Sequence, residues 1–221
     1  MKYSLKIVYS PLKWLICVIF VTILPFVMYV PTYYDFVNIS TLYLPFVGIV
    51  LFADLAIIDK ENHIEEITYL SDKKPVITYI QRYVLSLAIM LIYIIIANIV
   101  FYILHQLNNV EITEPISNFQ YIIITSGGCL FFSAMSMTIS TILNNVYIGY
   151  GFSLIYWLFW NINCQTEAFM NPFPFIANPA LYEKPLVIIY AFTLVLIILN
   201  CFLVSRSPFY LSDKMKKLLV K

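Results

Sequence analysis

QYIIITSGGCLFFSAMSMTISTILNNVYIGYGFSLIYWLFWN, residues 120–161, is an apolar run of 42 residues without a single charge, and it decides the fold. As one α-helix it would be about 63 Å long, roughly twice the length needed to cross a bilayer. Asn144 and Asn145 lie near its middle, and adjacent asparagines favour a turn. The run therefore predicts two helices joined by a tight turn.

The composition of the 221-residue chain is typical of an integral membrane protein. Hydrophobic residues make up 62% of it and charged residues 11%, and the mean hydropathy is +0.86. Soluble domains average about 25% charged residues. Four further apolar runs are each suited to a single crossing. The sequence thus predicts one all-α transmembrane domain over residues 1–221, with six spans at about 14–31, 41–58, 80–104, 120–143, 146–161 and 186–204.

The basic residues predict which parts of the chain face the cytoplasm. Of the 13 lysines and arginines, all except Lys184 lie in three places: the N-terminal segment, the region from residue 60 to 82, and the C-terminal tail. The connections at residues 31–40 and 105–119 contain neither residue type. By the positive-inside rule both termini are cytoplasmic, so the number of spans must be even.

DKENHIEEITYLSDKK, residues 59–74, is a charged segment between the second and third predicted spans. It holds eight charged residues, and each charge at a bilayer centre costs about 3 kcal/mol, so the segment must lie in water. At 100° per residue Ile64, Ile67 and Leu70 share one side, which predicts an amphipathic helix over about residues 60–72. It is either a solvated loop with an apolar edge on the membrane, or a short helix that docks on a cytosolic protein.

At these residues the chain resembles the transmembrane subunits of type-2 ABC exporters. In that family an acidic residue, a glutamate, a leucine pair and a proline precede a basic residue at the third span. The matching positions here are Glu61, Glu66, Tyr69-Leu70, Pro75 and Arg82, with Ile64-Glu65 where the family usually has glycine and threonine. The similarity extends over the whole chain, because six spans, cytoplasmic ends, a tight fourth-to-fifth turn and a long outer loop before the last span are the family's layout.

The resemblance implies that two such permease subunits, identical or related, pair in a bacterial plasma membrane. Each would rest a cytoplasmic coupling helix on a separate cytosolic ABC ATPase, which binds ATP and Mg²⁺. This chain has no GxxxxGK[ST] motif, so we expect no catalytic residue, metal or cofactor in it. We expect membrane lipid but no nucleic acid as a further partner. The predicted contact with the ATPase consists of Glu61, Ile64, Glu65, Glu66, Tyr69 and Leu70.

The predicted outer loop at residues 162–184 is unusually apolar for a solvated connection. Its core, MNPFPFIANPAL (residues 170–181), contains Pro172, Pro174 and Pro179. Non-helical backbone is tolerated at membrane depth where protein covers it. We therefore expect a re-entrant outer segment, as in the resembling family, and a flexible loop is the alternative.

The predicted spans contain small and neutral polar residues but almost no charge. Ser133, Ser136 and Ser140 recur at i, i+3 and i+7 in the fourth span, which indicates either close helix packing or a cavity wall. Carriers coupled to ions normally hold an ionisable residue near the midplane. The composition therefore favours an amphipathic or hydrophobic substrate, such as a peptide, lipid or drug.

Two other functions are compatible with the sequence. A non-transporting immunity or sensor subunit of an ABC complex could have the same fold. An intramembrane protease is suggested by the adjacent Glu65 and Glu66. However, the two histidines, His63 and His105, are predicted on opposite sides of the membrane, so we expect no zinc site.

Overall fold

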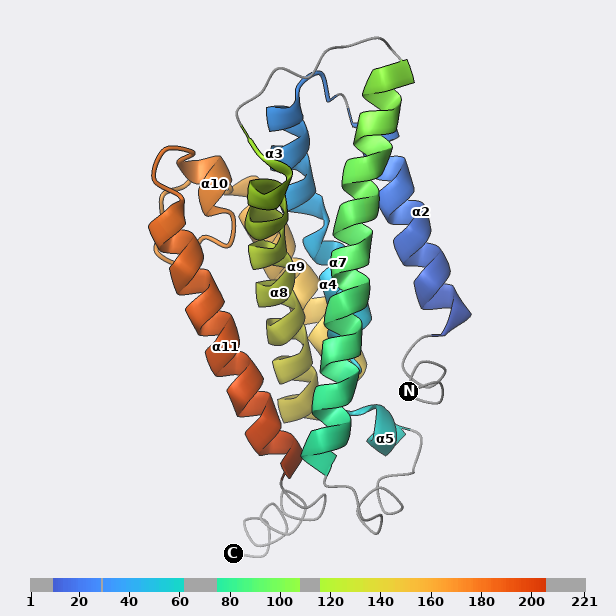
Figure 1. Cartoon of the computed structure of the whole chain (residues 1–221). Coiled ribbons are helices and arrows are strands. Elements are labelled where there is room, and N and C mark those ends of the chain that lie inside the picture. The colour runs from blue at the N-terminus through green and yellow to red at the C-terminus, as the bar shows by residue number, and fades with distance from the viewer. Residues whose placement is uncertain (1–9, 29, 62–74, 108–115, 206–221) are drawn as a thin grey trace, which may run out of the picture.

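The computed structural model describes residues 10–28, 30–61, 75–107 and 116–205, and every regular element in these ranges is a helix (Figure 1). This confirms the predicted all-α class for the described residues. The helices are α2 (Pro11–Val27), α3 (Tyr33–Tyr43), α4 (Pro45–Phe52), α5 (Ile58–Glu61), α7 (Pro75–Leu107), α8 (Asn118–Leu143), α9 (Val146–Ile162), α10 (Pro174–Ala177) and α11 (Glu183–Ser205).

Four segments of the described chain are long and apolar enough to cross a membrane: Tyr33–Phe52, Val76–Leu107, Asn118–Leu143 and Glu183–Ser205. The protein is therefore a membrane protein. Two further helices, α2 and α9, coincide with predicted spans but have only 17 residues each. At 1.5 Å per residue such a helix is about 26 Å long, slightly less than the hydrocarbon core.

A turn at Asn144 and Asn145 separates α8 from α9, at the predicted position. Asn144 adopts the left-handed conformation (φ 52°, ψ 39°), which asparagine tolerates better than most residues. The Asn145 side chain then accepts hydrogen bonds from the backbone N–H groups of Tyr147 (2.9 Å) and Ile148 (3.3 Å), and so caps α9. The two asparagines stop one helix and start the next.

The helix bounds around the second predicted span differ from the expectation of residues 41–58. The helix begins at Tyr33, because the Thr32 hydroxyl accepts a hydrogen bond from the backbone N–H of Asp35 and caps it. Most of the connection predicted at residues 31–40 is therefore helical. Pro45 divides the span into α3 and α4, since proline has no N–H to donate within a helix. Regular helix ends at Phe52, and a turn follows until Ile58.

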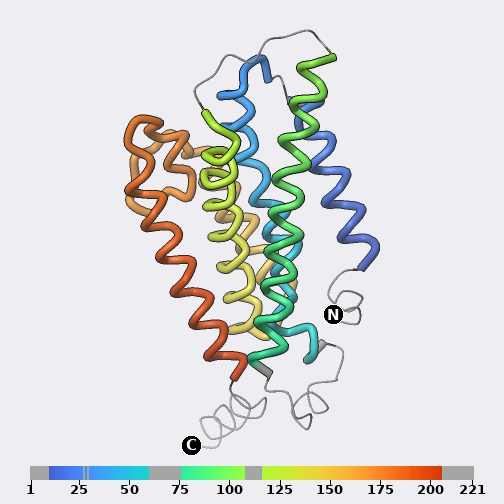
Figure 2. The backbone as a smooth tube through the Cα atoms, viewed as in Figure 1, coloured from blue at the N-terminus to red at the C-terminus, as the bar shows by residue number. Residues whose placement is uncertain are grey.

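Helix α8 is the central element of the bundle. It packs against α11, α4, α9 and α3, and most of its residues are buried, whereas most of α11 is exposed. The smooth trace in Figure 2 shows α11 and α7 flanking α8, with α2 beside α7 at the far edge. Helix α5, the start of α7 and the end of α11 lie at one end of the bundle, and α10 lies toward the other (Figure 1).

Candidate functional site

The charged segment leaves the bundle at α5, and the structure describes only its first three residues, Asp59 to Glu61. Glu61, one of the predicted ATPase contacts, is the last residue of α5. The other five predicted contacts lie outside the described residues: Ile64, Glu65, Glu66, Tyr69 and Leu70. The predicted coupling helix at residues 60–72 therefore remains a prediction. The described part of the site consists of the residues on either side of it.

An ion pair joins the first residue of the charged segment to α7, the helix that follows the segment. Arg82, in the third turn of α7, donates from Nη2 to Asp59 Oδ1 at 2.8 Å. The arginine is 7% exposed, so this charge is almost removed from solvent. A nearly buried charge is tolerated when it is paired. Asp59 is the first residue of the charged segment and Arg82 lies eight residues after its last, Lys74, so the pair connects α5 directly to α7.

A second ion pair lies near the same end. Lys13, at the start of α2, donates to the carboxylate of Asp54, in the turn after α4. The two side chains are 16% and 12% exposed, respectively. Asp54 is the acidic residue that interrupts the second predicted span, and a charge at such a position is expected to have a partner.

The segment after α9 is folded against the bundle. Asn171, 2% exposed, organises it: the side-chain amide donates to the carbonyls of Cys164 (2.9 Å) and Thr166 (2.8 Å), and Oδ1 accepts from the Phe173 N–H (2.8 Å). Phe173 is fully buried and stacks on Phe132 of α8 at 5.9 Å between ring centroids. A buried amide with three hydrogen bonds fixes the path of this backbone.

This segment lies alongside α8 because α9 is shorter than α8. Helix α8 has 26 residues and α9 has 17, a difference of about 13 Å in length. The space above α9 is filled by the segment, because the Pro172 carbonyl and the Phe173 ring both lie near Gly128. Gly128 is about 15 Å along α8 from Asn118. Of the three predicted prolines, Pro172 and Pro174 are buried and Pro179 is exposed.

Ser133, Ser136 and Ser140 of α8 lie at helix contacts and are fully buried. Ser133 faces α4, where a β-carbon added to Gly48 would lie 2.5 Å from its Oγ. Ser136 and Ser140 face α9, where a β-carbon added to Gly149 would lie 2.8 Å from the Ser136 carbonyl and 1.8 Å from Ser140 Oγ. Within this chain they allow close backbone approach, as small residues do in membrane helices.

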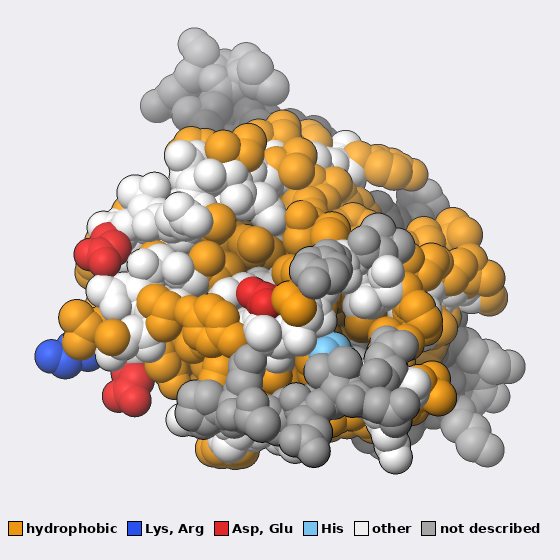
Figure 3. Space-filling model, turned by 90° about the horizontal axis from the view of Figure 1, so that it is seen from above, with side chains coloured by type: hydrophobic (Ala, Val, Ile, Leu, Met, Phe, Trp, Pro, Cys, Tyr) orange, Lys and Arg blue, Asp and Glu red, His pale blue; other side chains and the backbone are white. Residues whose placement is uncertain are grey.

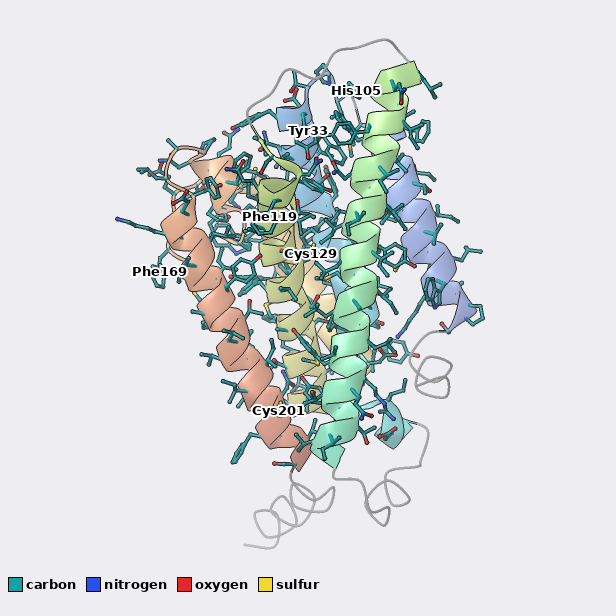
Figure 4. All side chains as sticks on the ribbon, viewed as in Figure 1. Tyr33, His105, Phe119, Cys129, Phe169 and Cys201 are labelled. Carbon is teal, nitrogen blue, oxygen red and sulfur yellow. The ribbon has the colours of Figure 1, made fainter. Side chains whose placement is uncertain are left out.

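A polar network that the sequence did not indicate lies toward the α10 end. Tyr33 donates to Asn98 Oδ1 (3.1 Å), Asn98 donates to Asn118 Oδ1 (3.2 Å), and Tyr102 donates to the same oxygen (2.9 Å). These residues come from α3, α7 and α8. Figure 4 shows Tyr33 with His105 at this end of the bundle, and Cys129 midway along α8. The network joins three helices without any charge.

The described residues contain no group of three or more histidine, cysteine or acidic side chains that could hold a metal ion. His105 lies near two carbonyl oxygens, those of Phe101 (3.3 Å) and Pro31 (3.4 Å), and His63 is outside the described residues. The end of the molecule that carries α10 is mostly hydrophobic and uncharged polar surface (Figure 3).

No protein-family model, curated protein or solved structure matches this chain.

Proposed function

We propose that this chain is the permease subunit of an ATP-driven ABC exporter in a bacterial plasma membrane. The observation that carries the proposal is the Asp59–Arg82 ion pair, because it ties the start of the charged segment to α7, the membrane helix that follows the segment. A segment that only needed to reach water would require no such anchor. A segment that transmits force from a soluble partner does require one.

The proposed mechanism assigns binding and movement to different chains. A separate ATPase binds and hydrolyses ATP, and its closure displaces the coupling helix at residues 60–72. The ion pair carries that displacement into α7, and the short turn from Phe52 to Ile58 carries it into α4. Helix α8 contacts both α4 and α7, so the movement reaches the centre of the bundle. Two permease subunits, each on its ATPase, would alternate between inward- and outward-facing states.

The proposed substrate is amphipathic or hydrophobic: a peptide, a lipid or a drug. Its support is the character of the polar groups buried in the described helices. Asn98 and Asn200 are neutral, and Asn200 donates to Thr138 at 2.6 Å. The two described ion pairs involve α5, the turn after α4, the first turn of α2 and the third turn of α7, away from the midplane of the bundle. Such an interior suits transport of an uncharged or amphipathic group better than ion coupling.

The test is co-purification of the chain with an ATPase encoded beside it, and the ATP turnover of the complex. Glu65→Lys combined with Glu66→Lys should abolish both co-purification and stimulated turnover, because the acidic face is inverted. Glu167→Lys combined with Glu183→Lys makes the same charge change at the other end of the bundle and should leave the complex intact. Equal co-purification of both double variants would overturn the assignment.

The immunity or sensor alternative is distinguished by transport. Inside-out vesicles that contain the complex should accumulate a co-encoded peptide or lipid when ATP is supplied. An intact, ATP-hydrolysing complex that accumulates none of the co-encoded candidates would instead identify a non-transporting subunit. A protease would cleave a peptide without any ATPase and would lose that activity on substitution of Glu65 and Glu66.

A further inference from the structure

A pocket of about 250 Å³ opens beside α11, where the segment after α9 meets the membrane helices. Its lining includes Phe131 of α8, three residues of α11 (Ile188, Phe192 and Val195), and Phe169 and Met170 of the segment after α9. Every residue that lines it is apolar. Figure 4 places Phe169 beside the upper half of α11.

A second pocket of about 250 Å³ adjoins the first and shares Phe169 and Ile188 with it. Its lining includes three polar side chains, Glu167, Asn171 and Asn178. Glu167 is the one charged residue in that lining, and all lining residues belong to the described part of the chain. Asn178 donates to Glu167 Oε1 at 2.9 Å and so orients the carboxylate.

The lining of the apolar pocket decides what can enter it. All of its lining residues are apolar, so the pocket suits an aliphatic chain. A molecule that fills both pockets therefore needs an apolar chain joined to a polar headgroup.

The Glu167 carboxylate in the second pocket determines which kind of polar headgroup can bind there. A carboxylate attracts a cation and repels the phosphate of an anionic lipid. An ammonium group can donate to Glu167 and also to the side-chain oxygens of neighbouring amides. We propose that the two pockets together bind one membrane lipid that carries a primary amine, with an acyl chain over Phe131 and the amine beside Glu167. This inference is independent of the proposed transport function.

The test uses the full chain in vesicles of equal parts phosphatidylethanolamine and phosphatidylglycerol, doped with either lipid carrying a photoactivatable acyl chain. Mass spectrometry of the digested chain locates the adducts. We expect the ethanolamine probe to label α11 and the segment around Phe169 about tenfold more than the glycerol probe, as one charge-assisted hydrogen bond would provide. Glu167→Gln should remove this preference while its remaining oxygen still accepts from Asn178.

Two variants of α11 separate the pocket from general lipid contact. Ala191→Phe places a ring in the apolar pocket and should reduce labelling by both probes about tenfold, whereas Leu194→Phe adds the same ring to an exposed position outside it. Thermal unfolding of each variant confirms that it is folded. If both probes label all variants equally, the pocket makes only ordinary, non-selective contact with lipid, and the proposal is wrong. An intermolecular disulfide through Val195→Cys that abolishes labelling would assign the opening to a second copy and overturn the proposal.

Discussion

Arg82 of α7 and Asp59 of α5 form a 2.8 Å ion pair that connects residues separated by 23 positions in the chain. The charged segment begins at Asp59 and ends at Lys74, before Arg82. The pair therefore links α5 to α7 directly, across the connection between them. Its energetic importance follows from burial, because the guanidinium has little water to replace a lost carboxylate.

We predict that Arg82→Gln and Asp59→Asn each reduce the free energy of unfolding by about 2 to 3 kcal/mol. The double variant should cost less than the sum, because each single change already removes the interaction. Thermal unfolding in detergent, followed by intrinsic fluorescence, measures both effects. Lys184→Gln, at an exposed position of α11, is the control and should be neutral. Strictly additive losses would show that the pair is not coupled.

Gly149 and Gly151 provide a matched test of the α8–α9 contact. A β-carbon at Gly149 would lie 1.8 Å from Ser140 Oγ and 2.8 Å from the Ser136 carbonyl, whereas one at Gly151 meets nothing within 4 Å. Gly149→Ala should therefore cost about 1 to 3 kcal/mol through overpacking. Gly151→Ala should be neutral or stabilise by less than about 1 kcal/mol. Equal unfolding temperatures of the two variants would contradict this close contact.

The sequence predicted the elements better than their contacts. Apolar length and the asparagine pair located α8, α9 and the turn between them, since both signals are local. The start of the helix at Tyr33 was not predicted, because Thr32, which caps it, lies within the connection predicted at residues 31–40. The Lys13–Asp54 pair and the network at Asn98 join distant segments, and periodicity within one helix carries no information on such partners.

Asn171 is the residue on which the segment after α9 depends most. Asn171→Ala removes three hydrogen bonds and leaves two carbonyls and one N–H without that partner, at a cost of about 2 to 3 kcal/mol. We expect faster proteolysis between residues 163 and 182. Asn163→Ala is the control, because its side chain donates only within its own helix, to the Phe159 carbonyl. If the two variants are cleaved at the same rate, Asn171 does not hold the segment in place.

The positions of α5 and α11 also predict how the chain is exposed on the two sides of the membrane. Lys184 lies at the first turn of α11, about 30 Å along that helix from its far end, which lies at the α5 end of the bundle (Figure 1). In a chain without its native cysteines, Lys184→Cys should react with an impermeant maleimide in intact cells. Glu65→Cys, in the charged segment that follows α5, should react only after permeabilisation, because the basic residues around that segment favour the cytoplasm. Labelling of both positions in intact cells would contradict the arrangement of six spans with cytoplasmic ends, since one face of the membrane cannot expose both ends of α11.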